Sequence, residues 1–597
     1  MKRKLVCLIS IMMLAVFTIL PITASAEVSV GYDSADFYGQ PSVILRADSA
    51  ESLNGLSAET LPASVYMQVN ASLEVIGADG ASLGSFSQIW TEQVKGKALP
   101  VVQPQDAAAY AALETYLQTE AIEDLAIASS DITILMEAAD ASLRVMYIAG
   151  GMQTPVLRSA EIGKANVVGA QTMILDYAQA DAELVRQIQA RFKTVWVMTD
   201  GSSVQIADAL GRGAYGIITP DAGAAYEVYG SIRKVVAEGE ERPTVLARAP
   251  FVAAHRGDWG VTYSENTVGA IESASQYGAT HAEIDIRLTA DNQIVVFHND
   301  SVTYNGKSVA VKSLTLAQIQ EIVLSDKISH IPTIDEVFAS MRDGKLGDML
   351  LIVEFKGQEA ELATLFSQKV QEYGVSDNIV IISFYPAQIQ RMTELLPSVP
   401  TSLLLYTTGG ENALEQAAAV KSGIDMQRDS LRTYYGDGTL ASAYSTMFRM
   451  LADRGYSLWL WTYETETMPE AFRYGVTGIT TNNCWYSMNF IETLQVEKEM
   501  TVDSLPEEGS TIEVSARTYK GEEVQVPAKV VYLETSGKEA TAVLVAQPEE
   551  GLGLISESVT FRAKAGGCSS AAAVSIGAVS VLLLAGAAVL LGKRKSA

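Results

Sequence analysis

Three carboxylates interrupt apolar, strand-like runs of the sequence. Glu283 and Asp285 lie two residues apart in A-E-I-D-I, so in a strand their side chains project to one face. Glu354 lies in a second run, L-L-I-V-E-F-K, beside Lys356. Taken singly, each carboxylate could form a structural ion pair, but like charges gathered in an apolar setting repel one another unless a cation lies between them. Oxygen ligands of this kind favour calcium or magnesium over zinc.

Two of the four histidines lie where a strand-like run ends. His255 follows F-V-A-A and His298 follows I-V-V-F. Strand ends that face βα loops are the places where catalytic groups of α/β barrels lie, so the two imidazoles are candidates for a general acid and a general base. His281 and His330 lack this setting, and we interpret both as structural.

The elements that could position these side chains extend from about residue 42 to about residue 480. Short β-branched runs alternate with helical stretches rich in Ala, Glu and Gln, for example at 283–286 and 350–355. Such alternation predicts βα units with parallel strands. Most of the runs are nearly continuously apolar, as expected for a sheet that is buried on both faces.

An internal repeat divides this region into two halves. V-W-V-M-T followed by G-I-I-T (195–219) is similar to L-W-L-W-T followed by G-I-T-T (458–481), with nearly equal spacing between the blocks. We therefore predict two tandem TIM-like (β/α)₈ barrels, at residues 27–245 and 248–495. The alternative is that βα units resemble one another without any duplication.

The two ends of the chain and the region after the barrels have different textures. Residues 497–565 alternate in the manner of short strands and predict a small β-rich domain, interpreted as a spacer. Residues 571–592 are uncharged and long enough to cross a bilayer, and a basic tail follows at 593–597. Residues 1–26 have the layout of a secretory signal peptide. By the positive-inside rule, we expect an exported protein anchored in the cell membrane, with both barrels extracellular.

The overall charge excludes one class of partner. Lys and Arg number 43 against 70 Asp and Glu, a formal net charge of −27. Such a chain repels phosphate backbones, so nucleic acid is not expected as a partner. An anionic small molecule would need a locally positive site or a bound metal. The three cysteines are too few and too far apart for a disulfide framework or a thiolate metal site.

Several short motifs around these residues occur in one order over about residues 250–490. They are, in chain order, A-H-R-G, S-E-N-T, E-I-D-I, V-F-H-N-D, I-P-T-I-D-E-V-F, V-E-F-K, W-T and G-I-T-T. In both content and order they closely resemble the glycerophosphodiester phosphodiesterase family. The resemblance implies a TIM barrel, a divalent metal, and hydrolysis of a small-molecule glycerophosphodiester to sn-glycerol 3-phosphate and an alcohol.

The resemblance also implies roles for individual residues. Glu283, Asp285 and Glu354 would hold the metal, and His255 and His298 would act as general acid and base. The remaining expected site residues bind or support the substrate: Arg256 and Lys356 the phosphate, Glu265 with Asn266 the site around it, and Trp461 the floor of the glycerol pocket.

Two positions depart from the family pattern. His298 is followed by Asn299 and Asp300 where His-Asp is common, which leaves the partner that orients His298 open. Asn482 stands where an Asp is usual, and we expect this change to affect a loop rather than catalysis.

The first barrel is predicted to be a catalytically inactive copy. No histidine occurs between Met1 and Pro250, so the acid and base pair is missing. L-R-V-M-Y-I-A-G (143–150) aligned on L-L-I-V-E-F-K-G (350–357) removes a ligand and a cation as well. The alignment gives these equivalent positions: Leu45 for His255, Arg46 for Arg256, Gln68 for Glu283, Asn70 for Asp285, Tyr147 for Glu354 and Ala149 for Lys356.

Two other functions remain open at this point. A phospholipase C or D could use the same scaffold on intact lipid, and a non-catalytic cell-surface protein could keep a barrel for binding alone. A wall or teichoic polymer is a further candidate partner.

Overall fold

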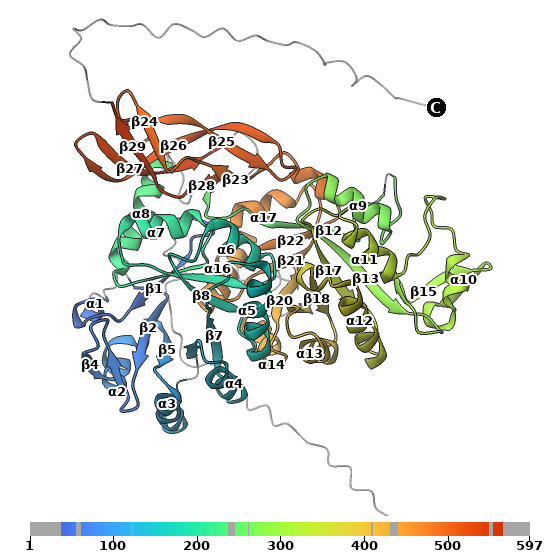
Figure 1. Cartoon of the computed structure of the whole chain (residues 1–597), viewed down its shortest axis with the longest axis horizontal. Coiled ribbons are helices and arrows are strands. Elements are labelled where there is room, and N and C mark those ends of the chain that lie inside the picture. The colour runs from blue at the N-terminus through green and yellow to red at the C-terminus, as the bar shows by residue number, and fades with distance from the viewer. Residues whose placement is uncertain are drawn as a thin grey trace, which may run out of the picture.

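Two closed barrels of eight parallel strands each account for most of the chain (Figure 1). The computed structural model describes residues 37–564, apart from 55, 57–60, 121, 123, 237–244, 261, 407–409, 430–439 and 549–552. The predicted signal peptide, membrane span and basic tail all lie outside the described residues. Among the helices that are described, none is both long and apolar enough to cross a membrane.

The first barrel closes through pairing of its first and second strands. Its strands are β1 (Ser42–Arg46), β2 (Ser64–Val69), β5 (Leu99–Pro104), β6 (Ala126–Ser129), β7 (Arg144–Ile148), β8 (Thr172–Asp176), β9 (Thr194–Met198) and β10 (Gly216–Thr219). Its connecting helices are α1 (Ala50–Asn54), α3 (Ala107–Thr119), α4 (Ile132–Asp140), α5 (Pro155–Val168), α6 (Ala182–Gln189), α7 (Ser203–Gly211) and α8 (Ala222–Val236).

The second barrel closes in the same way. Its strands are β12 (Phe251–His255), β13 (His281–Leu288), β17 (Leu350–Phe355), β18 (Ile379–Ser383), β19 (Thr401–Leu405), β20 (Gly423–Gln427), β21 (Trp459–Tyr463) and β22 (Gly478–Thr481). Its helices are α9 (Val268–Gln276), α11 (Ile334–Arg342), α12 (Ala360–Tyr373), α13 (Pro386–Leu395), α14 (Gly410–Ala419), α16 (Leu440–Asp453) and α17 (Met468–Tyr474). The prediction of two TIM-like barrels is confirmed.

Each barrel carries an insertion after its second strand. The first has the hairpin β3 (Glu74–Ile76) and β4 (Ser82–Ser85), followed by the short helix α2 (Phe86–Ile89). The second has β14 (Ile294–Val296), the hairpin of β15 (Ser301–Tyr304) and β16 (Lys307–Ala310), and α10 (Leu316–Gln320). Because this second insertion begins where β13 ends, it lies beside the carboxylate-bearing strand.

Local sequence signals explain where many helices begin and end. Asp106 and Asp131 accept hydrogen bonds from backbone N–H groups at the starts of α3 and α4. Thr154 caps α5, with Pro155 in its first turn, and Gly169 ends this helix in the left-handed conformation. Thr333 and Glu336 form a reciprocal capping box at the start of α11.

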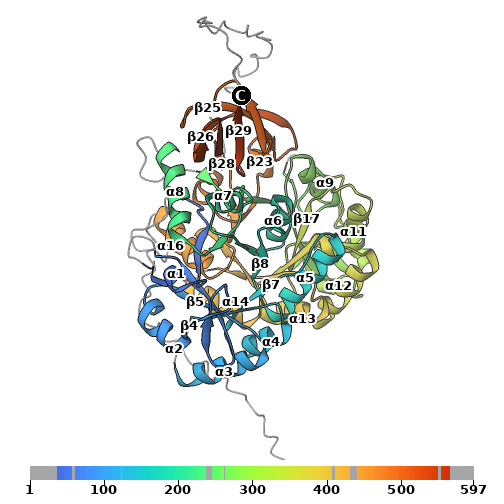
Figure 2. The ribbon, with the colours of Figure 1, turned by 60° about the vertical axis from the view of Figure 1, so that its left-hand side comes forward.

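The chain after the barrels folds as a β-rich region that contacts both of them. Its strands are β11 (Val245–Leu246), β23 (Ile491–Gln495), β24 (Glu499–Val502), β25 (Thr511–Thr518), β26 (Glu523–Ser536), β27 (Glu539–Ala546), β28 (Gly553–Ile555) and β29 (Val559–Ala563). The strand β11 comes from the segment between the barrels and pairs with β28. In both views the region lies over α7 and α8 (Figures 1 and 2).

Specific contacts join this β-rich region to each barrel. Arg212 Nε of the first barrel lies 2.8 Å from Glu557 Oε2. The Tyr519 hydroxyl donates to the carbonyl of Pro250, just before the second barrel, at 2.5 Å. The region therefore ties the barrels together, which is more than the predicted spacer would do.

The barrels pack against each other through the amino-terminal ends of their strands. Phe192, just before β9, stacks on Trp459 at the start of β21, with ring centroids 3.8 Å apart. His281, at the start of β13, lies with Nε2 2.8 Å from the carbonyl oxygen of Ala190. The Thr194 hydroxyl donates to the Gly455 carbonyl at 2.8 Å. The carboxyl ends of the strands, where barrel active sites lie, are thus left free of this interface.

Candidate active site

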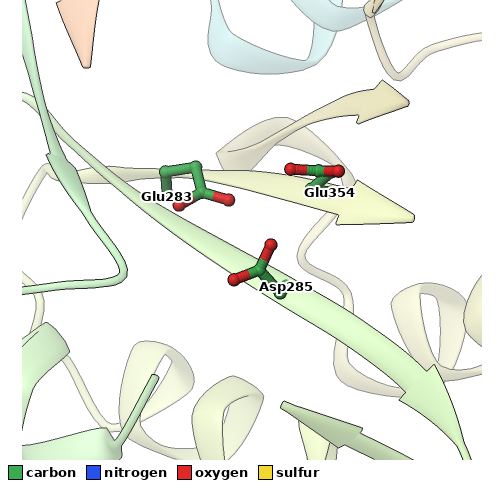
Figure 3. A group of neighbouring side chains, drawn as sticks. All are labelled: Glu283, Asp285 and Glu354. Atoms are coloured by element: carbon green, nitrogen blue, oxygen red, sulfur yellow. The ribbon is translucent and has the colours of Figure 1, made fainter. Parts of the chain in front are cut away.

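The three predicted carboxylates meet on two neighbouring strands, level with the carboxyl-terminal end of β12. Glu283 and Asp285 come from β13, and Glu354 comes from β17, directly in register with Asp285 (Figure 3). One carboxylate oxygen from each residue lies within 4.8 Å of the others. All three side chains are buried. This group can hold a metal ion, because three carboxylates supply hard oxygen ligands at the right spacing.

Burial and neighbouring charges shift the pKa values of these three carboxyl groups in different directions. Burial, followed by repulsion from Asp285, raises the pKa of Glu283 well above its ordinary value and that of Glu354 to about 7. Burial would also raise the pKa of Asp285, but the nearby charge of Lys356 holds it below its ordinary value. Lys356 Nζ lies 2.7 Å from Glu354 Oε1 and 3.2 Å from Asp285 Oδ1.

The surroundings of one carboxylate oxygen of Glu283 are direct support for a bound cation. Glu283 Oε2 accepts a hydrogen bond from the backbone N–H of Arg256 at 3.1 Å. Glu283 Oε1 is buried and has no hydrogen-bond partner among the described residues. A buried carboxylate oxygen without a partner is costly, and a divalent cation shared with Asp285 and Glu354 removes that cost.

Arg256 and Asn266 contact Asp285, and Glu265 contacts Arg256. Arg256 Nε lies 3.4 Å from Asp285 Oδ2, and its Nη1 donates to Glu265 Oε2 at 2.9 Å. The Asn266 side chain donates to Asp285 Oδ2 at 2.8 Å and accepts from the Asp285 backbone N–H at 3.0 Å. Asn266 therefore fixes both the side chain and the strand position of Asp285.

A steric constraint explains why glycine follows Arg256 in the A-H-R-G motif. Gly257 has φ +81°, and a Cβ there would lie 2.7 Å from the backbone carbon of Ala270. No other residue fits without moving the helix that follows. The tight turn directs Arg256, itself at φ +60°, back over the carboxylates.

His255 is held by a residue that sequence reasoning assigned elsewhere. Its Nδ1 lies 2.6 Å from Asn482 Oδ1, just after β22, and its Nε2 lies 3.9 Å from Glu283 Oε2. The expectation that Asn482 affects only a loop is wrong, because the amide oxygen contacts the imidazole directly. Burial, followed by the charge of Arg256, lowers the pKa of His255 to about 4.

His298 lies in the insertion after β13, between β14 and β15. Its Nδ1 lies 3.0 Å from Asn299 Oδ1, which answers the open question of its partner. Its backbone carbonyl accepts from Arg287 Nη2 at 2.6 Å and Nε at 3.0 Å. Burial lowers the pKa of His298, and the charge of Asp285 opposes that effect.

The two remaining histidines have structural surroundings. His281 is completely buried at the interface between the barrels, and burial lowers its pKa to about 3. His330 Nε2 lies 2.8 Å from Glu336 Oε1 near the surface. Neither contacts the carboxylate group.

Trp461 belongs to an aromatic wall that was only partly foreseen. Phe384 and Tyr406 stack at 4.4 Å, and each meets the Trp461 ring edge to face, at 5.7 and 5.5 Å. Both follow directly after an apolar strand, β18 or β19, and this position could have identified them.

Asp425, on β20, was also missed. It is buried, and burial followed by the charge of Glu354 raises its pKa well above the ordinary value. A single acid within a strand has no sequence signal that separates it from a structural ion pair.

Strand register shows that the first barrel retains none of the metal ligands. Trp196 pairs with Gly216 as Trp459 pairs with Gly478, which fixes the superposition of the two barrels. Following the pairing from there gives these equivalent positions: Arg46 for His255, Tyr66 for Glu283, Gln68 for Asp285 and Gln103 for Glu354.

The predicted residue correspondences between the barrels are therefore wrong in detail. Leu45, Gln68 and Asn70 were placed one or two residues out of register. Tyr147 lies on β7, the fifth strand, whereas Glu354 lies on the third strand of its barrel. Tyr147 also donates to Glu161 of α5 at 2.7 Å. With the corrected correspondences, the first barrel still lacks all three anionic ligands.

Comparisons with known proteins agree with this site. Residues 255–484 match the model of the glycerophosphoryl diester phosphodiesterase family. A putative glycerophosphodiester phosphodiesterase of Bacillus subtilis is 28% identical over 243 residues, 39% of this chain and 94% of the relative. A glycerophosphodiester phosphodiesterase of Caldanaerobacter subterraneus is 29% identical over 249 residues, with the same coverage.

A solved structure covers the same part of the chain. The crystal structure of a glycerophosphodiester phosphodiesterase from Parabacteroides distasonis is 26% identical, with a TM-score of 0.34, and covers 40% of this chain and 94% of that one. Residues 255–484 are thus similar to the glycerophosphoryl diester phosphodiesterase family. The chain is thus a phosphodiester hydrolase, and its first barrel has the same strand order as the second.

Proposed function

We propose that the second barrel hydrolyses glycerophosphodiesters to sn-glycerol 3-phosphate and an alcohol, with the help of a divalent cation. The observation that carries the proposal is the buried group of Glu283, Asp285 and Glu354, which lies close to two cations and to His255. Calcium and magnesium both suit these oxygen ligands. When bound, such a cation supplies Lewis acidity that polarises the phosphate and the attacking hydroxyl.

The residues divide the remaining work between them. Arg256 and Lys356 stabilise the negative charge that develops on the phosphoryl oxygens. His255 is neutral at neutral pH; when its Nδ1–H donates to Asn482, its Nε2 is free to accept a proton. Burial lowers the pKa of His298, and in its protonated form this residue would donate a proton to the departing alcohol.

These positions suit a two-step reaction without a covalent enzyme intermediate. The glycerol 2-hydroxyl attacks phosphorus, its proton goes to His255, and the bond to the leaving alcohol breaks as His298 protonates that oxygen. Water then opens the cyclic phosphate with the two histidines in reversed roles, which restores both protonation states.

The proposed location is the outer surface of a cell membrane. Support comes from the signal-peptide layout of residues 1–26 and the uncharged stretch at 571–592 with its basic tail. A chain truncated before Ala571 should be released in soluble and active form. A truncated chain that stays on membranes would mean that the barrels themselves bind lipid.

Release of sn-glycerol 3-phosphate from glycerophosphocholine, with and without a chelator, tests the proposed activity. We expect release that stops with the chelator and returns with calcium or magnesium. Release of phosphocholine instead, or hydrolysis of intact phospholipid only, would favour a phospholipase. No turnover of any diester would favour a binding protein.

A further inference from the structure

His298 lies between two strands rather than within one. The strand β14 ends at Val296 and β15 begins at Ser301, so His298 lies in the bend that joins them. Its neighbours Asn299 and Asp300 are exposed. A general acid has to be held within hydrogen-bond reach of the oxygen that it protonates. Contacts outside the strand ladder must therefore fix the position of His298.

The side chain of Arg287 binds the backbone of His298. Arg287 Nη2 and Nε donate to the His298 carbonyl oxygen at 2.6 and 3.0 Å, and Arg287 Nη1 lies 2.7 Å from Asp300 Oδ1. Three nitrogen atoms of one guanidinium thus contact the bend that carries His298. A planar guanidinium can make these contacts together because its donors have a fixed geometry, whereas a lysine ammonium has no such fork.

The sheet fixes the position of Arg287. Its backbone pairs with Val295 of β14, and its side chain is only 16% exposed. Asp285 lies two residues earlier in β13, so both side chains project to one face of this strand. The Asp285 carbonyl also accepts from the backbone N–H of Phe297 at 2.8 Å. One strand therefore carries a proposed metal ligand and also contacts the two residues Phe297 and His298.

Arg287 is distinct from the cations of the carboxylate group. Among the described residues its ion pair is with Asp300, and it has none with the three carboxylates. Arg256 and Lys356 are the cations that contact those carboxylates. An effect of Arg287 on turnover should therefore be transmitted through His298.

We propose that Arg287 is a positioning residue for His298, because its contacts with the His298 carbonyl hold the imidazole where it protonates the leaving alcohol. This inference rests on the proposed function, in which His298 supplies that proton. The bond between phosphorus and the leaving oxygen breaks as before, and Arg287 takes no part in the proton transfer.

Two diesters with different leaving groups test the inference on the full-length protein. Choline release from glycerophosphocholine needs a proton on the leaving oxygen, whereas 4-nitrophenolate leaves the 4-nitrophenyl ester of sn-glycerol 3-phosphate without one. Arg287→Met should lower kcat for choline release about 10²-fold with KM little changed, because a misplaced acid stabilises only the transition state less well. The release of 4-nitrophenolate should change little. Arg342→Met, at an exposed position on α11, is the matched control and should change neither rate.

A double variant shows whether the effect is transmitted through His298. Arg287→Met combined with His298→Ala should be no slower than His298→Ala alone, because the contact has nothing to position once the imidazole is gone. Arg287→Lys is a second variant in case Arg287→Met does not fold. It keeps the charge and the aliphatic stem but loses the two-donor contact, so it should show the same dependence on the leaving group.

The same measurements can overturn the inference. Unchanged choline release by Arg287→Met, or equal losses with both diesters, would show that Arg287 does not act through the acid. A double variant far slower than His298→Ala would give Arg287 a separate role. No hydrolysis of either diester by the wild type would refute the proposed function itself, and the inference with it.

Discussion

The imidazole of His255 and the amide of Asn482 meet at 2.6 Å, between Nδ1 and Oδ1. These residues are 227 positions apart and lie at the ends of the first and last strands of the second barrel. The hydrogen bond to this neutral amide raises the pKa of His255, but burial and the charge of Arg256 outweigh it and keep the pKa at about 4.

Asn482→Asp should therefore change the pH dependence of turnover. The added negative charge favours the protonated imidazole and raises the pKa of His255, roughly by 1–2 pH units. Because the base form of His255 is needed, the acid limb of the kcat/KM profile should move to higher pH. Asn483→Asp is the control, since Asn483 bonds Glu464 and not His255. Superimposable profiles for all three proteins would contradict the role given to Asn482.

The first barrel should contribute no hydrolysis. His255→Ala combined with His298→Ala removes the acid and base of the second barrel, and each loss alone costs about 10²–10⁴-fold. Since Tyr66, Gln68 and Gln103 offer no anionic ligand, turnover by the double variant should fall to background. Gln103→Ala alone should keep the wild-type rate. Residual metal-dependent turnover that Gln103→Ala abolishes would reveal a second active site.

The interface between the barrels should make a large contribution to stability. Phe192→Ala removes the ring that stacks on Trp459 and leaves a cavity between the barrels, which typically costs about 3–5 kcal/mol. The free energy of unfolding from denaturant titration measures this loss. Trp485→Ala, at a ring that is 43% exposed, serves as the control and should cost far less. Equal losses would mean that the stacking is unimportant.

Lys193 should make stability depend on pH above neutrality. It is fully buried, its Nζ donates to the Ala170 carbonyl at 2.9 Å, and burial lowers its pKa from 10.5 to about 7. Between these two values the unfolded chain binds more protons than the folded one, so stability rises with pH over about 7 to 10.5.

Lys193→Met removes that dependence. The variant should have a higher Tm than the wild type at pH 7, and the difference should shrink as the pH approaches 10. A difference in Tm that does not change with pH would show that Lys193 is charged in the folded protein.

Sequence reasoning found the carboxylates and histidines because each breaks the apolar pattern of a barrel strand. Glu283, Asp285 and Glu354 lie within runs of Val, Ile, Leu and Phe residues. The two strands that carry them pair in register. Sequence reasoning could not predict the contact between His255 and Asn482, because no local pattern connects the first strand of a barrel with its last.

The predicted residue correspondences between the two barrels were wrong for a different reason. Apolar strands resemble one another, so the match of 143–150 to 350–357 joined a fifth strand to a third. The packing of the two barrels against each other could not be predicted either. Nothing in the sequence distinguishes Phe192 from other loop residues, although its ring stacks on Trp459.

A calcium titration that records bound metal and product in the same samples tests the central claim most directly. Metal-free full-length protein should bind calcium at the carboxylate group, and release of sn-glycerol 3-phosphate from glycerophosphocholine should rise in parallel with occupancy. Glu354→Gln should weaken binding and lower turnover about 10²–10³-fold, because it removes an anionic ligand. Glu361→Gln, at an exposed position on α12, should change neither. Full turnover by the metal-free protein, or unchanged metal binding by Glu354→Gln, would contradict the account.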